Sequence, residues 1–148
     1  MTPKCNNKIS YSKNSNSYRL CIGCKEMYQD LIKLGCPPRK SLILKFPTDE
    51  QVPPKYKKDF MRGYVDGDGC LCYTDKSYSF SFVGTKDFID KAIEFFNWKT
   101  CKYDTTGKAY VWRCANKKLV PGYLQLLYQN STIYLDRKYE KYKKMINV

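Results

Sequence analysis

The chain has 148 residues, of which 43% are hydrophobic and 16% aromatic, enough for one domain with a substantial core. Its 27 Lys and Arg side chains outnumber 14 Asp and Glu, and the formal charge of +13 favours a polyanionic partner. Because the chain has no histidine, sites with a histidine general base and Cys₂His₂ zinc fingers are excluded, and any hydrolytic chemistry must use carboxylates and metal-bound water.

The N-terminal region is expected to be a small β-hairpin followed by a helix. The hairpin spans about residues 6–22, where Tyr18, Leu20 and Ile22 alternate as on a half-buried strand. The helix spans about 25–34, with Gly35 as its C-terminal cap. Residues 37–47, PPRKSLILKFP, form a basic connector bounded by prolines.

Eight cysteines raise the alternative of a structural zinc site. Cys21 and Cys24 form a CxxC pair, with Cys5 and Cys36 as outer ligands, but zinc knuckles usually pair two compact CxxC units, which favours the hairpin. The others are expected to be small buried residues in a reducing compartment: Cys70, Cys72, Cys101 and Cys114. With neither a long apolar run nor a signal-peptide pattern, we expect a soluble cytoplasmic protein with no membrane partner.

Residues 53–66 predict a helix that is built to pair with another helix. Its apolar stripe contains two glycines four residues apart, which allow a second helix backbone to approach closely. The stripe consists of Tyr56, Phe60, Gly63, Tyr64 and Gly67. Two acidic residues, Asp66 and Asp68, lie at the negative end of the helix dipole, where binding of a cation is favourable. Two such helices side by side would form an all-oxygen site suited to Mg²⁺.

Two other interpretations of the sequence DGDG are weaker. Asp and Gly are common in simple turns between a helix and a strand. A calcium loop needs a glutamate at its twelfth position, where this chain has Ser77.

The remaining elements alternate between strands and helices. Strands are expected near 70–74 and 78–83, a helix at 86–96, strands near 99–104 and 108–114 with a turn at Thr106 and Gly107, and helices at 117–129 and 132–146. The order from the motif helix onward is α-β-β-α-β-β-α-α, which indicates an α+β domain.

The segment from Phe60 to Gly69, FMRGYVDGDG, resembles the motif of LAGLIDADG homing endonucleases. Its fixed letters are matched by Gly63, Asp66, Asp68 and Gly69, and Gly67 is a common variant of the motif's alanine. Segments 81–88 and 132–142 resemble the sheet-to-helix junction and closing helix of bacterial and phage members. The resemblance covers about the last two thirds of the chain and implies an α-β-β-α-β-β-α domain whose curved antiparallel sheet forms a saddle in the DNA major groove.

The resemblance also implies roles for individual residues. Asp68 would bind Mg²⁺ or Mn²⁺ with the carbonyl of Gly67, Asp66 would cap or support the helix end, and Lys117 or Lys118 would assist the attacking water. Helix pairing would use Gly63, Gly67, Phe60 and Tyr64. Outward-facing strand residues would contact double-stranded DNA, with these candidates: Lys8, Ser10, Arg19, Ser79, Ser81, Lys102 and Arg113. No small-molecule substrate is expected.

An internal similarity divides the chain into residues 1–50 and 51–148. Residues 18–35 resemble residues 111–128 as a strand, a helix and a basic connector, so residues 1–50 look like the tail of a preceding repeat. With one complete motif, a two-metal site requires a second chain, and a homodimer is the leading assembly. The alternatives are a nuclease-inactive DNA- or intron-RNA-binding protein of the same fold, such as a maturase or regulator, and a decayed fragment of a mobile element.

Overall fold

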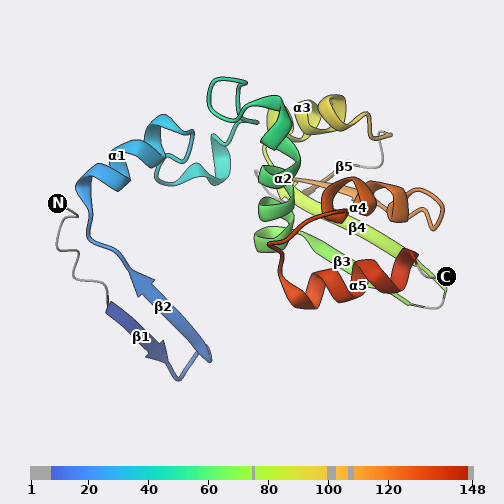
Figure 1. Cartoon of the computed structure of the whole chain (residues 1–148), viewed down its shortest axis with the longest axis horizontal. Coiled ribbons are helices and arrows are strands. Elements are labelled where there is room, and N and C mark those ends of the chain that lie inside the picture. Colours follow the sequence, from blue (N-terminus) through green and yellow to red (C-terminus); the bar gives the residue numbers. More distant parts are fainter. Residues whose placement is uncertain (1–7, 75, 100–102, 107–108, 147–148) are drawn as a thin grey trace.

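The computed structural model describes residues 8–74, 76–99, 103–106 and 109–146, which form helices and antiparallel strands (Figure 1). The N-terminal elements are β1 (Lys8–Ser12), β2 (Ser17–Cys21), α1 (Lys25–Lys33) and a short 3₁₀ helix, η1 (Lys40–Leu42). The remaining elements are α2 (Pro54–Asp68), β3 (Cys70–Tyr73), β4 (Tyr78–Gly84), α3 (Lys86–Phe96), β5 (Tyr103–Thr106), β6 (Ala109–Cys114), α4 (Val120–Tyr128) and α5 (Asp136–Ile146).

The chain from Leu44 onward, here called the body, contains a four-stranded antiparallel sheet with strand order β3-β4-β6-β5 and shares one hydrophobic core. The two central strands pair Phe82 with Trp112 and Ser81 with Arg113. Since side chains alternate between the two faces of a strand, the aromatic residues share one face and the polar ones the other. The mixed α+β class and the predicted order of elements from α2 onward are confirmed.

The core lies on the aromatic face of this sheet. Phe80, Phe82, Trp98 and Trp112 are buried, and the two indole rings stack with centroids 5.3 Å apart. The buried stripes of the helices complete this core, among them Phe88 and Ile89 of α3 and Val120, Leu124 and Leu127 of α4. The predicted helix α3 is confirmed at both ends because Thr85 Oγ1 accepts a hydrogen bond from the Phe88 amide, while Asn97 closes the last turn with a φ of 51°.

Two predicted helices begin later than expected. The Asn116 side chain accepts hydrogen bonds from the amides of Lys118 and Leu119, so residues 117–119 form a turn and α4 starts at Val120. The last helix starts at Asp136 rather than at residue 132. Of the predicted strand 99–104, residues 100–102 lie outside the described part of the chain, as does Gly107 of the predicted turn.

The N-terminal hairpin and helix lie apart from the body in Figure 1, with α1 joined to α2 through η1. The hairpin and α1 form where predicted, and Gly35, with a φ of +88°, follows the end of the helix. The expectation of a half-buried strand is wrong, because Tyr18, Leu20 and Ile22 are all exposed. Among the described residues, no helix has both the length and the apolar character that crossing a bilayer requires.

Candidate functional site

The glycine face of α2 is open. Gly63 and Gly67 are exposed, and a Cβ atom added at either position would meet no atom of the described chain within 4 Å. The opposite face is anchored, since Met61 and Val65 are fully buried in the core. Helix α2 is therefore fixed by one face and presents a smooth, side-chain-free strip on the other.

The two aromatic residues predicted to pair helices, Phe60 and Tyr64, pack against other side chains of their own chain. Phe60 and Tyr64 are half-buried and pack against Phe88 of α3, with ring centroids 6.4 and 4.6 Å away. Phe60 also meets Phe46 edge to face at 6.1 Å. These side chains flank the glycine face but are held mainly by their own core, so the glycines alone define the free strip.

The C-terminal end of α2 is set by a glycine with no room for a side chain. The Gly69 amide donates to the Val65 carbonyl at 2.9 Å and closes the last turn. A Cβ at position 69 would lie 2.7 Å from that carbonyl oxygen, closer than real Cβ contacts. The final glycine of the motif is therefore required by sterics, and it allows the chain to enter β3 immediately at Cys70.

A buried lysine caps this helix end. Lys138 Nζ donates to the carbonyls of Asp66 at 2.9 Å and Gly69 at 2.6 Å, and also to the carbonyl of Val65. Burial and the neighbouring Arg137 lower the pKa of Lys138, while Asp66 and Asp68 act in the opposite direction. The ammonium group of Lys138 therefore stabilises the negative end of the α2 helix dipole.

Asp66 points into the chain rather than toward the glycine face. Its two carboxylate oxygens accept hydrogen bonds from the Tyr128 hydroxyl at 2.6 Å and from the Leu135 amide at 3.0 Å. Burial, together with the bond to Asp66, raises the pKa of Tyr128, so the phenol remains a donor. Asp66 therefore supports the helix end, as predicted, by joining α2 to the segment between α4 and α5.

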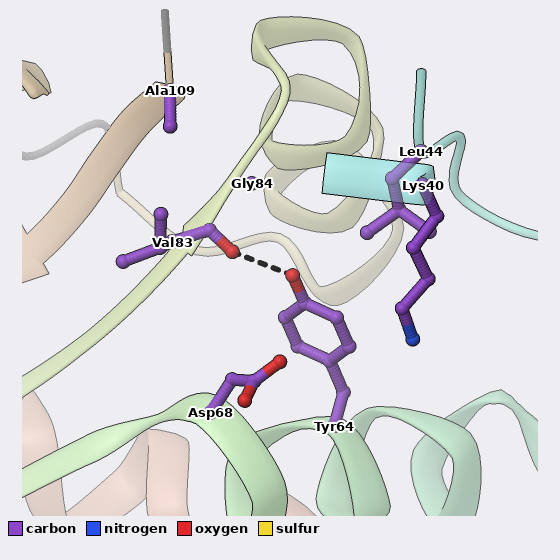
Figure 2. A pocket seen from close by; sticks show the side chains of 7 residues that line it. All are labelled: Lys40, Leu44, Tyr64, Asp68, Val83, Gly84 and Ala109. Carbon is purple, nitrogen blue, oxygen red and sulfur yellow. Dashed lines mark hydrogen bonds between the residues drawn. The ribbon is translucent and has the colours of Figure 1, made fainter. Parts of the chain in front are cut away.

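Asp68 is exposed and lines an open recess of about 310 Å³ at the end of α2 (Figure 2). Across this recess the Tyr64 hydroxyl donates to the Val83 carbonyl at 2.5 Å. Burial, and secondarily the charge of Asp68, raises the pKa of Tyr64 to about 12. The side chain of Lys40, from η1, and that of Ala109, from β6, also face the recess.

One chain offers few protein ligands for a metal at this site. Within the described residues, no three Cys, Asp or Glu side chains are grouped so as to hold a metal ion. The donors available at the open end of α2 are the Asp68 carboxylate and the Gly67 carbonyl, which accepts none of the hydrogen bonds found among the described residues. Both are hard oxygen donors of the type that Mg²⁺ prefers, but Mg²⁺ has six coordination positions to fill.

The two lysines predicted to assist the water are not brought to Asp68. Both are exposed, and Lys117 lies over the Tyr78 ring, 5.0 Å from its centroid. Tyr78 starts β4, whereas Val83, five residues later, lies at the recess, so the two places are about 17 Å apart along the strand. Because β6 runs antiparallel to β4, the residues after its end, including Lys118, emerge at the far end of the sheet.

The open face of the sheet carries part of the predicted DNA-contacting set. Arg113 is exposed in the centre of this face and Ser79 is half-buried. Ser81 lies on this face as predicted, but it is only 8% exposed between its strand partners Cys70 and Arg113. Lys8, Ser10 and Arg19 are exposed on the separate N-terminal hairpin, and Lys102 lies outside the described residues.

Two of the cysteines expected to be buried are exposed. Cys70 and Cys72 are exposed on the open side of the sheet, because Leu71 between them is the residue of β3 that enters the core. Cys114 is buried as predicted, and Cys101 lies outside the described residues.

Lys138 and Tyr128 are structural residues of this site that the sequence analysis missed. A usable signal was present for the lysine: Lys138, Tyr142 and Met145 follow the spacing i, i+4, i+7 and form the buried stripe of α5. A charged residue on such a stripe needs a buried partner, which here is the group of carbonyls at the end of α2.

Comparisons with known proteins find a likeness among solved structures. No family model matches the chain, and no curated protein matches it. Among solved structures, the chain is similar to a homing endonuclease, I-TnaI, with a TM-score of 0.45 and 16% identity over 61% of this chain and 69% of that chain. At this level of similarity, the function has to be argued from the residues of the site.

Proposed function

We propose that this chain is a metal-dependent, site-specific double-strand DNA endonuclease of the LAGLIDADG homing type, with its active centre formed where two copies of α2 pair. The observation that carries the proposal is the open glycine strip, Gly63 and Gly67, which leads directly to the exposed carboxylate of Asp68. A helix that keeps a side-chain-free strip exposed can pack closely against a second helix. Two such helices bring two Asp68 carboxylates and two Gly67 carbonyls together.

A divalent cation would be held by Asp68 and by the Gly67 carbonyl of each copy. When bound, such an ion polarises a phosphoryl oxygen and lowers the pKa of a bound water, which supplies the nucleophile for phosphodiester hydrolysis. The protein's own contribution is to keep these oxygens in place. Gly69, Lys138 and Asp66 do this by fixing the end of α2 from the inner side.

The basic composition and the open sheet face support DNA as the substrate. A formal charge of +13 attracts phosphates, and a β-sheet face can enter the major groove. Arg113, exposed at the centre of this face, has the geometry to read guanine with two hydrogen bonds.

The placement of the lysines favours a second candidate, a DNA- or RNA-binding protein of the same fold without nuclease activity. Lys117 and Lys118 lie at the far end of the sheet from Asp68, and Lys138 is engaged with carbonyls. Of the residues that line the Asp68 recess, Lys40 is the lysine that would have to assist a water molecule.

A selection followed by a cleavage assay separates these candidates. Duplexes bound by the protein would be selected from a randomised library in EDTA and then incubated with Mg²⁺. The proposal expects cleavage that requires Mg²⁺ and is lost in Asp68→Asn, while duplex binding persists. Glu50→Gln, an equal charge change at an exposed position outside α2, is the matched control and should still cut. Binding without cleavage by the unmodified chain would instead identify the nuclease-inactive protein.

A further inference from the structure

The N-terminal hairpin has two chemically different faces. The register pairs Ile9 with Leu20 and Tyr11 with Tyr18, so four large apolar side chains project from one face, each between 49% and 78% exposed. Lys8, Ser10 and Arg19 are among those on the other face. A two-stranded hairpin is at best marginally stable in water without further strands or a helix to cover its apolar face. This hairpin therefore requires a covering element.

Helix α1 carries an exposed apolar stripe with the same residue spacing as the buried apolar stripe of α4. Met27, Leu31 and Leu34 follow the spacing i, i+4, i+7, and each is at least 40% exposed. In α4, three residues with this spacing, Val120, Leu124 and Leu127, are 0% exposed. None of the α1 side chains is buried, so this amphipathic helix lacks the surface on which its counterpart packs.

The body shows how such units cover one another. It contains two β-β-α units, β3-β4-α3 and β5-β6-α4, joined through their second strands to give the order β3-β4-β6-β5. Helix α3 contacts β6 as well as its own strand β4, and α4 contacts β4, so each helix packs at least partly on the central strand of the other unit. A single β-β-α unit consequently lacks both a second pair of strands and a partner strand for its helix.

The segment β1-β2-α1 is a third β-β-α unit of the same chain. Its hairpin lies apart from the body (Figure 1), and the end of α1 is held by the Gln51 side chain, which donates to the Lys33 carbonyl at 3.3 Å. We propose that this unit is completed by the same unit of a second copy of the chain, with the two hairpins joined through β2 and each α1 packed on the other copy's hairpin. This interface lies on a different surface from the α2 strip and does not depend on nuclease activity.

The exposed area is large enough for such an interface. Nine apolar residues of the unit, each at least 40% exposed, together present on the order of 1,000 Å², against about 800 Å² per partner in a standard interface. They are Ile9, Tyr11, Tyr18, Leu20, Met27, Tyr28, Leu31, Ile32 and Leu34. Patches of this size mark interaction surfaces on soluble proteins. The body has no free β-β-α unit among its described elements, because its two units already cover each other.

The test is the concentration dependence of the dimer, measured by sedimentation velocity on the full chain. The double variant Leu20→Glu with Leu31→Glu places charges on the apolar faces of β2 and α1, and we expect its dimer to dissociate at concentrations at least tenfold higher than the unmodified dimer. The control, Ser10→Glu with Gln29→Glu, makes the same charge change on the polar faces and should leave dissociation unchanged. Both tryptophans lie in the body, so their fluorescence reports that the body stays folded.

Hydrogen exchange gives a second readout, in which the β2 amides of the unmodified chain gain protection as its concentration rises. A monomeric unmodified chain, or a dimer that the apolar-face variant does not weaken, would overturn this interface. Gly63→Leu tests the proposed pairing of α2 helices independently of the N-terminal interface. A dimer weakened by Gly63→Leu and not by the N-terminal variant would support the α2 pairing only. A dimer weakened by the N-terminal variant and not by Gly63→Leu would support the N-terminal interface only.

Discussion

The two acidic residues of the motif have different tasks, although they are two positions apart. Asp66 is bonded to Tyr128 and Leu135 and holds the end of α2 to the C-terminal helices. Asp68 is exposed at the recess and accepts none of the hydrogen bonds found among the described residues. The first residue therefore contributes to stability, and the second is available for chemistry.

This division is testable with a double-mutant cycle. Asp66→Ala and Tyr128→Phe remove the two partners of one partly buried hydrogen bond, so their effects on the free energy of unfolding should be coupled by about 1–2 kcal/mol. Asp68→Ala combined with Tyr128→Phe should be additive. Urea denaturation measures both cycles, and additivity in the first would show that the Asp66 bond does not stabilise the fold.

Lys138 should be a stability determinant rather than a contact to DNA. Lys138→Met keeps the apolar stem but removes the donor to the carbonyls of Asp66 and Gly69 and one of the two donors to the Val65 carbonyl. We expect a loss of about 2–4 kcal/mol in the free energy of unfolding, measured by chemical denaturation. Lys144→Met, an exposed position on the same helix, should change it by less than about 0.5 kcal/mol. Equal stability of the two variants would refute the capping role.

At the scale of elements, α2 combines a buried face with an exposed glycine strip. Replacing Gly63 by leucine adds a side chain where the single chain has open space, so the folded chain accommodates it. Leucine also has the higher helix propensity, and the isolated chain should gain about 0.5–1 kcal/mol in stability.

The same Gly63→Leu change should abolish DNA cleavage, because the side chain separates the two paired helices. Gly122→Leu is the matched control: Gly122 is an exposed glycine of α4 whose Cβ position is also empty, so this variant should cut normally. A Gly63→Leu protein that cleaves at the unmodified rate would rule out pairing through this strip.

The sheet face gives a separate expectation for DNA affinity. Arg113→Gln should weaken binding to the selected duplex about tenfold and relax the preference at one base pair, if Arg113 reads a guanine. Fluorescence anisotropy with single-base variants of the duplex measures both effects. Lys144→Gln, which removes one charge from the last helix, should lower affinity evenly across sequences. A uniform loss for Arg113→Gln would assign it to the phosphates.

Periodic patterns were sufficient to predict most helices and strands, and steric or polar contacts between distant segments explain the errors. Helix α3 was predictable because its cap, apolar stripe and terminal residue are all local. The expectation that Cys70 and Cys72 are buried is wrong because three consecutive apolar residues give no indication of which face Leu71 takes. The carbonyls that Lys138 binds lie about seventy positions earlier in the chain, beyond any local pattern.

At the scale of the molecule, the body is preceded along the chain by an N-terminal β-β-α unit whose apolar side chains are exposed. The body hides its aromatic core and leaves the glycine strip of α2 open, while the N-terminal unit exposes apolar surface. The sequence similarity between residues 18–35 and 111–128 anticipated a shared element order, but it gave no indication that the same apolar spacing would be buried in one copy and exposed in the other. Both open surfaces lead to an assembly of two chains.

The stoichiometry of the cleaving complex tests the central claim most directly. Sedimentation of the protein with its selected duplex, at a concentration where Mg²⁺-dependent cleavage is complete, gives the number of 17.4 kDa chains per DNA. We predict two chains on each duplex, since one chain supplies a single Asp68. Complete double-strand cleavage by one chain per duplex would contradict the account.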